Sequence, residues 1–248
     1  MNKILIDKKI ICDNNDIDIN GNEITFKKSG IYEVEYVIDG KYELTFNISS
    51  DITLLETSFN RKLDINNRYV IKNGNLKIYK FYDNLSVNEI INIDLCTKES
   101  KVDYKFSNIC HTSENYVINI NHLARETISN INNKSVGLNN SKIDFIINSN
   151  VIKEAIKCEL SQNTRIVTMG ECHAKISPNM FTPLDDVMAK HGSIIGTFKE
   201  EDIFYLMSKG ISYNDTLKLM IKGYLLSNID ILHEVRKKIM DIIDRYWR

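Results

Sequence analysis

The stretches IINIDL (Ile90–Leu95), VINI (Val117–Ile120) and IDFII (Ile143–Ile147) set the pattern for the middle of this sequence. Similar short apolar runs recur between Arg68 and Ile176, and polar, asparagine-rich corners separate them. No helical period persists here, and apolar runs of this length between turn-forming residues are typical of β-strands. This spacing predicts a sandwich, a barrel or a coiled β-solenoid, and periodicity alone does not choose among the three.

The first fifty residues alternate between apolar and polar side chains. One alternating stretch surrounds Asn20-Gly21, and a second surrounds Asp39-Gly40. Asn-Gly and Asp-Gly favour two-residue hairpin turns, because both turn positions need a backbone that accepts positive φ. We therefore expect the N-terminal region to be an antiparallel β-meander.

The C-terminal region changes to a helical period. Thr197 and Glu200 form a capping-box pattern at the start of a predicted helix, and Gly210 marks its end. Ser212 and Asp215 repeat the capping pattern. The apolar residues that follow have the spacing of one helix face: Leu217, Met220, Ile221, Tyr224 and Leu225. With a last helix over about residues 229–247, three amphipathic helices are predicted.

The composition narrows the class of protein. The formal net charge of the 248 residues is -1, so there is no basic excess with which to bind nucleic acid or an anionic membrane. The apolar run Ile4–Ile6 is too short for a signal-peptide core, and no later run approaches a membrane span. The five cysteines are scattered and form no CxxC pair. These features predict a cytoplasmic protein with free thiols.

Metal binding by thiol and imidazole side chains is the function that the sequence motifs leave as a candidate. Glu171-Cys172-His173 places a thiol beside an imidazole, with Cys158 before it and His191 after it. Thiolate and imidazole ligands suit iron, zinc or copper(I). Neighbours on a strand point to opposite faces, however, so Cys172 and His173 are not expected to share one metal, and the same holds for Cys110 and His111.

Other catalytic motifs are missing. The segment Gly192–Gly196 (GSIIG) lacks the lysine and the spacing of a phosphate-binding P-loop, so we expect this chain to bind no nucleotide. Gly-x-Ser-x-Gly and His-Glu-x-x-His do not occur, and no paired general acid and base is evident. We therefore do not expect an enzyme.

Two C-terminal segments resemble a known family. Met188–Gly196 (MAKHGSIIG) is similar to the HGA-x-x-G segment of the SufB/SufD family of iron–sulfur cluster assembly proteins of the SUF system, and Glu200–Ser212 (EEDIFYLMSKGIS) resembles that family's E-x-x-x-F-Y-L-x-S-R-G-I helix. Residues 213–226 look like the next helix, and Ser141–Phe145 and Ser177–Met180 echo further segments. The resemblance is strong over about residues 177–226, weaker from about residue 115, and absent from the N-terminal region.

The resemblance implies a mainly β fold, a right-handed parallel β-helix with a C-terminal α-helical domain. The expected parts are an N-terminal β-meander (1–64), a β-helix core (65–196) and an ATPase-docking helical domain (197–248). Family members pair with each other through the β-helix and bind the ABC-type ATPase SufC through the C-terminal helices. The complex is a scaffold on which a nascent iron–sulfur cluster forms, and ATP hydrolysis is supplied by the partner. A cysteine desulfurase or sulfur carrier would be a further partner.

Site residues are carried over position by position. The residues expected to receive the ATPase are Phe204, Tyr205, Met207, Leu217, Met220 and Ile221. His191 occupies the place of the family's interface histidine. Cys158 lies near the essential β-helix cysteine of SufB-type chains, and Cys172 is its rival. The resemblance makes Cys158, Cys172 and His191 the candidate ligands of a transient iron–sulfur cluster.

The sequence departs from the SufB pattern in ways that leave alternatives open. Gly192 follows the matching histidine, as in SufD chains, where SufB chains usually have glutamate. The chain is also much shorter than typical members. It is expected to be either a minimal homodimeric scaffold or the support of a longer SufB-like chain. One alternative is an interaction module that binds the ATPase without touching iron. The other is a β-helix enzyme acting on a polysaccharide, which would need carboxylates along successive coils.

Overall fold

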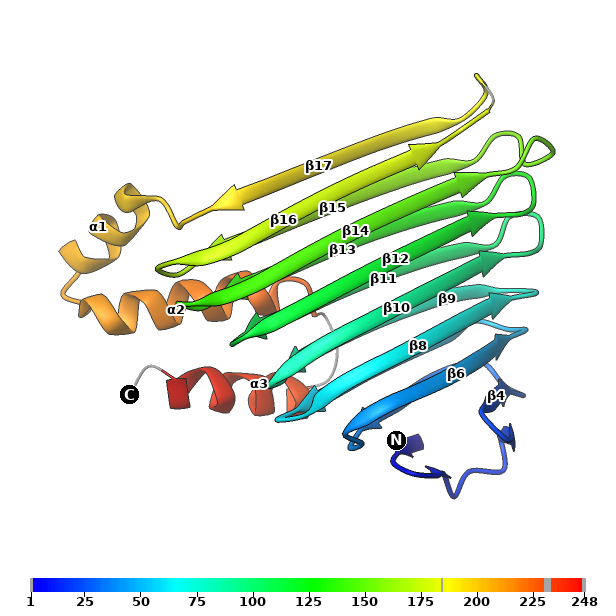
Figure 1. Cartoon of the computed structure of the whole chain (residues 1–248), viewed down its shortest axis with the longest axis horizontal. Helices are drawn as coiled ribbons and strands as arrows, with labels where there is room; N and C mark the ends of the chain where they lie inside the picture. Colours follow the sequence, from blue (N-terminus) through cyan, green and yellow to red (C-terminus); the bar gives the residue numbers. More distant parts are fainter. Residues whose placement is uncertain (1, 184, 230–232, 247–248) are drawn as a thin grey trace.

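The structure, a computed structural model, describes residues 2–183, 185–229 and 233–246. Its strands form two sheets (Figure 1). Sheet A has the order β17-β15-β13-β11-β9-β7-β5-β1-β2. Its strands are β1 (Asn2–Ile6), β2 (Ile10–Ile11), β5 (Gly30–Tyr36), β7 (Ile52–Phe59), β9 (Asn75–Asp83), β11 (Lys101–Cys110), β13 (Ile128–Gly137), β15 (Glu159–Thr168) and β17 (Met188–Gly196).

Sheet B has the order β16-β14-β12-β10-β8-β6-β4-β3. Its strands are β3 (Ile17–Asn20), β4 (Glu23–Phe26), β6 (Gly40–Ile48), β8 (Lys62–Ile71), β10 (Ser86–Leu95), β12 (Ser113–His122), β14 (Ser141–Val151) and β16 (Cys172–Phe181). From β4 onward, successive strands alternate between the two sheets, and each pairs in parallel with the strand one turn away. The chain is therefore a β-solenoid of about seven turns, which confirms the predicted β-helix.

The solenoid forms because apolar side chains alternate along nearly every strand. In β12 and β14, every second residue points inward and is buried, while most residues between them stay partly exposed. The two inward faces meet in one core that runs along the solenoid, and stacked rings such as Tyr116 and Phe145, with centroids 4.9 Å apart, fill it.

The predicted antiparallel meander is wrong for most of the N-terminal region. The hairpin at Asn20-Gly21 exists, since β3 and β4 pair antiparallel around it. Asp39-Gly40 instead connects β5 in sheet A to β6 in sheet B, and both strands pair in parallel with their neighbours. A corner that crosses between sheets needs the same turn-forming residues as a hairpin, so the local sequence does not separate the two. The division of the chain into domains stays a prediction; β8 carries sheet B without a break across residues 64 and 65.

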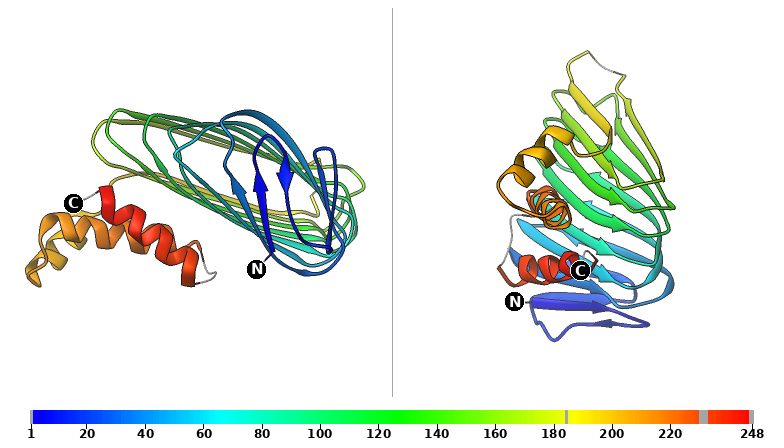
Figure 2. Two further views of the ribbon diagram at one scale, coloured as in Figure 1. Left: turned by 90° about the horizontal axis from the view of Figure 1, so that it is seen from below. Right: turned by 90° about the vertical axis from the view of Figure 1, so that its left-hand side faces the viewer.

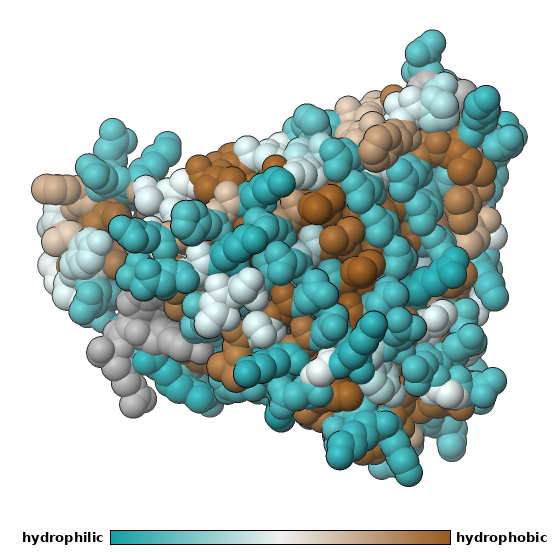
Figure 3. All heavy atoms as spheres, in the orientation of Figure 1, coloured by the Kyte–Doolittle hydropathy of each residue, from teal (hydrophilic) through white to brown (hydrophobic). Residues whose placement is uncertain are grey.

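An asparagine ladder follows the outer face of sheet B. Asn92, Asn119, Asn148 and Asn179 each donate a side-chain N–H to the asparagine one turn below, over 2.8–3.2 Å. The ladder begins at Asn66 in β8 and ends at Asn179 in β16, the last strand of the sheet. These amides satisfy one another along the stacking direction, as in other stacked parallel sheets. Figure 3 shows the face seen in Figure 1 as mainly hydrophilic, with scattered hydrophobic side chains.

Three described helices follow the solenoid: α1 (Glu200–Ser208), α2 (Tyr213–Leu226) and α3 (His233–Tyr246). They lie along one side of the flattened solenoid (Figure 2), where a second hydrophobic cluster joins α2 and α3 to the outer face of sheet A. Residues 230–232 and 247 of the predicted third helix lie outside the described residues. Within the part of the chain that the structure describes, every helix is too short or too polar to cross a membrane.

The helix starts differ from each other. Ser212 caps α2 as predicted, because its hydroxyl accepts a hydrogen bond from the Asp215 backbone N–H over 3.2 Å. The predicted cap at Thr197 is wrong. Lys199 is the N-cap of α1, and no side chain among the described residues caps that helix. Since α1 begins at Glu200, the Thr197 side chain stands outside the first turn.

Candidate functional site

The last turn of the solenoid ends in two edge strands. Among the strands that the structure describes, β17 is bonded only to β15 and β16 only to β14, so each has one side without a neighbouring strand. β17 is exposed almost throughout, and the exposed fraction of the Met188 side chain is 65%. An exposed edge presents unpaired N–H and C=O groups that can bond to a strand of another chain.

Two of the predicted site residues lie near this edge. His191 is an exposed residue of β17, in register with Gln162 of β15. Cys158 stands just before β15 and is buried; its Sγ lies 3.1 Å from the Ala155 carbonyl oxygen and 3.2 Å from Thr127 Oγ1. The hydroxyl of Thr127 also contacts the buried ring of His122, 2.7 Å away, and burial lowers the pKa of His122 to about 4. His122 is therefore neutral near pH 7.

Cys172 belongs to the opposite end of the strands. It is the first residue of β16, and its Sγ accepts a hydrogen bond from Ser141 Oγ over 3.3 Å. Cys110 lies close by and is fully buried; burial, with Glu114 and Cys172 nearby, raises the pKa of its thiol far above the ordinary value. β15 separates Cys158 from Cys172, and its ten residues span about 33 Å.

The structure therefore does not bring Cys158, Cys172 and His191 together. Across residues 2–183, 185–229 and 233–246, no three His, Cys, Asp or Glu side chains are grouped closely enough to hold a metal ion. A ligand set for an iron–sulfur cluster is thus incomplete in the described part of a single chain, since such clusters use four protein ligands.

The α1 helix presents an apolar surface to solvent. None of its residues is buried, and the exposed fractions are 77% for Phe204, 63% for Tyr205 and 41% for Met207. We call these three residues the α1 face. A groove of about 430 Å³ lies between α1, the start of α2 and the corner after β15. It is lined by Thr168, Met169, Gly170, Thr197, Phe198, Glu200, Ile203, Phe204, Met207, Tyr213 and Leu217. Glu200, Glu201 and Asp202 make the first turn acidic.

The other predicted partner-binding residues have a different location. Leu217 and Ile221 are buried against sheet A, where they pack with Ile109, Val136 and Val167. Met220 is partly buried against the same cluster. Ile221 and Met220 pack against the solenoid, whereas Leu217 also lines the groove beside α1, and the expectation that this face receives a partner stays a prediction. These residues can hold α2 in place, and α1 is left as the exposed surface.

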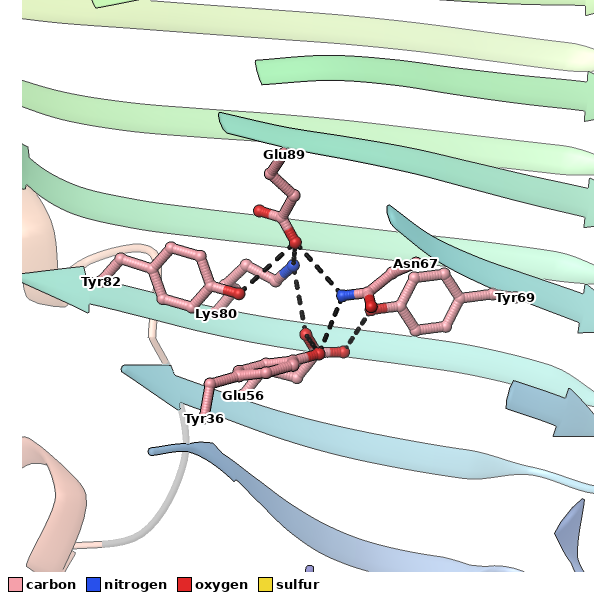
Figure 4. Close-up of polar contacts among 7 residues, drawn as sticks. All are labelled: Tyr36, Glu56, Asn67, Tyr69, Lys80, Tyr82 and Glu89. Carbon is pink, nitrogen blue, oxygen red and sulfur yellow. Dashed lines mark hydrogen bonds and ion pairs between the residues drawn. The ribbon is translucent and has the colours of Figure 1, made fainter. Parts of the chain in front are cut away.

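Sequence reasoning missed a polar cluster inside the solenoid. Figure 4 shows Lys80 of β9 between Glu56 of β7 and Glu89 of β10, with Asn67, Tyr36, Tyr69 and Tyr82 around them. Lys80 Nζ lies 3.1 Å from Glu56 and 2.7 Å from Glu89, and all three side chains are completely buried. Burial alone would lower the pKa of Lys80, but the two carboxylates raise it well above its ordinary value. Burial raises the pKa of Glu89, and the Lys80 ammonium opposes that shift.

A signal for this cluster exists in the sequence. Period-two alternation in β9 places Lys80 on the same face as Leu76, Ile78 and Tyr82, which is the inward face. A lysine on the apolar face of a strand predicts a buried partner, because an unpaired buried charge is very costly. Which carboxylates supply that partner depends on the turns above and below, and the strand itself does not reveal them.

Residues 55–224 match the family described as "SUF system FeS cluster assembly, SufBD core domain". The chain is similar to the iron–sulfur cluster assembly protein SufD of Bacillus subtilis, with 25% identity over 136 residues, which cover 54% of this chain and 31% of the relative. It is also similar to an iron–sulfur cluster assembly SufBD family protein of Pyrococcus horikoshii, with 32% identity over 49% of this chain and 28% of the relative.

A third relative is the iron–sulfur cluster assembly protein SufD of Escherichia coli, with 29% identity over 34% of this chain and 20% of the relative. In each of these three pairs the chain matches less than a third of the relative's length. The matched region, residues 55–224, takes in the solenoid from β7 onward together with α1 and most of α2.

Proposed function

This chain belongs to the SufBD family of SUF-system iron–sulfur cluster assembly proteins, and on that premise we propose that it is a non-catalytic scaffold subunit. In this proposal it pairs with a second SufB/SufD-type chain at the end of its solenoid and binds a SufC-type ABC ATPase through α1. The partner hydrolyses ATP, and the iron–sulfur cluster is the cargo that the complex assembles.

The proposal that a SufC-type ATPase binds this chain rests on the α1 face. Aromatic side chains are costly to leave in water, and three neighbouring apolar residues with a groove beside them are typical of a protein-binding surface. The acidic first turn beside the groove favours a partner with basic residues at the rim of its docking site. α2 and α3 anchor this surface to the solenoid through the second hydrophobic cluster.

The open edges of β16 and β17 support the pairing with a second chain. Strand addition at both edges would continue sheets A and B into the partner and would cover the exposed side chain of Ile195, which is in register with the buried Ile166. His191 lies on β17, so such a pairing would bury it between the two chains. A second chain could then complete the ligand set that one chain lacks, with sulfur delivered by a desulfurase or a sulfur carrier.

An interaction-only role is the second candidate, and the scattered thiols favour it. With Cys158 buried, Cys172 near the other end of the strands and Gly192 after His191, the chain could support a longer SufB-like partner and never contact iron. The ATPase and edge contacts are the same in both roles, so only cluster chemistry separates them.

The test combines binding with anaerobic reconstitution. The chain and a SufC-type ATPase are mixed, and the complex is isolated by size-exclusion chromatography. The complex is then incubated with iron and sulfide without oxygen, and thiolate-to-iron absorption is recorded. Complex formation with this absorption supports the scaffold, and complex formation without it supports the interaction-only role. If no complex forms, the proposed ATPase contact is wrong. If absorption is unchanged in Cys158→Ala, Cys172→Ala and His191→Ala chains, the proposed ligands are wrong.

A further inference from the structure

The polar cluster inside the solenoid contains an amine, an amide and a shared carboxylate in close contact. Glu89 Oε1 accepts a hydrogen bond from Lys80 Nζ over 2.7 Å and another from Asn67 Nδ2 over 3.2 Å. Because they share this acceptor oxygen, the distance between Lys80 Nζ and Asn67 Nδ2 cannot exceed the sum of the two hydrogen-bond lengths. Figure 4 shows the two side chains reaching the same oxygen from facing strands, Lys80 from β9 of sheet A and Asn67 from β8 of sheet B.

We propose that Lys80 and Asn67 form an intramolecular isopeptide bond, with Glu89 as the proton carrier. The Lys80 amine attacks Cγ of Asn67, the new Nζ–Cγ bond forms, and the Cγ–Nδ2 bond breaks. The Lys80 ammonium loses two protons in all. Glu89 carries one of them to Nδ2, which makes ammonia the leaving group, and ammonia departs with the other as ammonium. The reaction therefore needs no oxidant, nucleotide or external reagent.

The position of Glu89 suits this task better than that of Glu56. A general acid–base group must reach both the proton it takes and the atom it protonates. Glu89 Oε1 bonds to the nucleophilic nitrogen and to the leaving nitrogen. Glu56 bonds to Lys80, Tyr36 and Tyr69, and through Tyr36 it reaches Asn67 only indirectly. Glu56 thus orients the cluster, and Glu89 transfers the proton.

The surroundings hold the reacting groups together and exclude water. Asn67, Lys80 and Glu89 have no exposed surface, and the buried rings of Tyr36, Tyr69 and Tyr82 surround them. The Tyr36 hydroxyl accepts a hydrogen bond from Asn67 Nδ2 over 2.8 Å, which fixes the amide plane, while Asn67 Oδ1 bonds to no described group. Positioning of this kind can replace a large part of the entropic cost of a reaction between two groups.

The charge state of Lys80 sets the speed of the reaction. Its ion pairs with Glu56 and Glu89 favour the ammonium form, and only the neutral amine is a nucleophile. The reaction must therefore begin with a proton transfer from Lys80 to Glu89, which burial makes more basic than an ordinary glutamate. We expect a slow maturation after folding. The finished bond would join β9 of sheet A to β8 of sheet B covalently inside the solenoid.

Mass spectrometry of the purified full-length chain is the test. After prolonged incubation of the folded protein, the intact mass is expected to be lower than the sequence mass by one ammonia molecule. Trypsin should release residues 63–68, which contain Asn67, joined to the peptide that runs through the uncleaved bond after Lys80. Succinimide formation at Asn20-Gly21 or Asn73-Gly74 also loses ammonia, but it joins no peptides, and mild base hydrolyses the ring to aspartate or isoaspartate.

Variants distinguish the roles of the two carboxylates. Glu89→Gln keeps the shape of the side chain but cannot carry a proton, so the cross-linked peptide should disappear. Glu56→Gln should keep it. Asn67→Asp should form the same bond with loss of water in place of ammonia. A folded wild-type chain that keeps its full sequence mass and yields separate peptides after incubation would overturn the proposal, whatever the variants do.

Discussion

The helices α1 and α2 follow each other in the chain and look alike in sequence, but the structure gives them opposite surroundings. Both are amphipathic, and both were expected to offer apolar side chains to the same partner. α2 buries Leu217, Ile221 and Leu225 against sheet A, whereas no residue of α1 is fully buried and only its Ile203 packs partly against the same cluster. An apolar helix face therefore indicates that some surface will cover it, and only the fold decides whether that surface belongs to the same chain.

The largest expected effect is on stability and concerns α2. Ile221→Ala should lower the free energy of unfolding by roughly 2–5 kcal/mol, because it leaves a cavity in the second hydrophobic cluster. Leu219→Ala, on the exposed side of the same helix, should change it by less than about 0.5 kcal/mol. Urea unfolding followed by circular dichroism measures both. Equal midpoints for the two variants would contradict the assignment of this face to the interior.

Burial also distinguishes the carboxyl groups inside the solenoid from those on its surface. Burial raises the pKa of Glu114, inside the solenoid, to about 8, against bonds from Tyr116 and Asn108 that lower it. The folded chain therefore keeps this proton up to about pH 8, whereas the unfolded chain loses it near the ordinary value of 4.5. The protonated Glu114 carboxyl therefore makes its full contribution to the free energy of unfolding below the ordinary pKa. This contribution declines as the pH rises to about 8, by at most about 1.4 kcal/mol per pH unit.

Glu114→Gln should remove this decline, so its free energy of unfolding should vary less with pH than that of the wild type over the same range. Urea unfolding at a series of pH values between the two pKa values measures the slope. Glu200→Gln, on the exposed first turn of α1, is the matched control and should keep the wild-type slope. A wild-type slope in Glu114→Gln would show that this carboxyl is already ionised in the fold.

The α1 face should matter for binding and not for folding. Phe204→Ala is expected to weaken the complex with a SufC-type ATPase about tenfold or more, since exposed aromatic residues often dominate protein interfaces. Its urea midpoint should stay at the wild-type value. Isothermal titration calorimetry measures the affinity. Leu123→Ala removes another exposed apolar residue, on the corner after β12, and should bind as the wild type does. If the two variants bound the ATPase with equal affinity, the ATPase would bind at a surface other than the α1 face.

The smallest expected effect concerns the helix starts. Ser212→Ala should destabilise the chain by about 1 kcal/mol, because it removes the hydrogen bond to the Asp215 N–H. Thr197→Ala should cost less than about 0.5 kcal/mol, because Thr197 caps no helix in this structure. The difference between their urea midpoints is the measurement, and a larger loss for Thr197→Ala would reverse the comparison.

Several features could be read from residues near one another in the chain. The alternation in the middle strands indicated a mainly β fold. The predicted Asn20-Gly21 hairpin and Ser212 cap were correct. The resemblance around Met188–Gly196 and Glu200–Ser212 indicated the family. The wrong expectations share a cause. Asp39-Gly40 and Thr197 are acceptable in more than one local arrangement, and the choice depended on distant strands.

The sequence by itself thus determined the period of the strands, the amphipathic pattern of the helices and membership of the SufBD family, since each is written in residues close together in the chain. Only the tertiary structure decided that α2 is covered and α1 is not, that Cys158 and Cys172 lie near opposite ends of β15, and that Lys80 meets Glu56, Glu89 and Asn67. The physical reason is that each turn of a solenoid stacks residues separated by some twenty to thirty positions. Contacts between such residues depend on the register of the turns. That register is set by the hydrophobic patterns of several strands and by the geometry of their turns together, so no single strand reveals it.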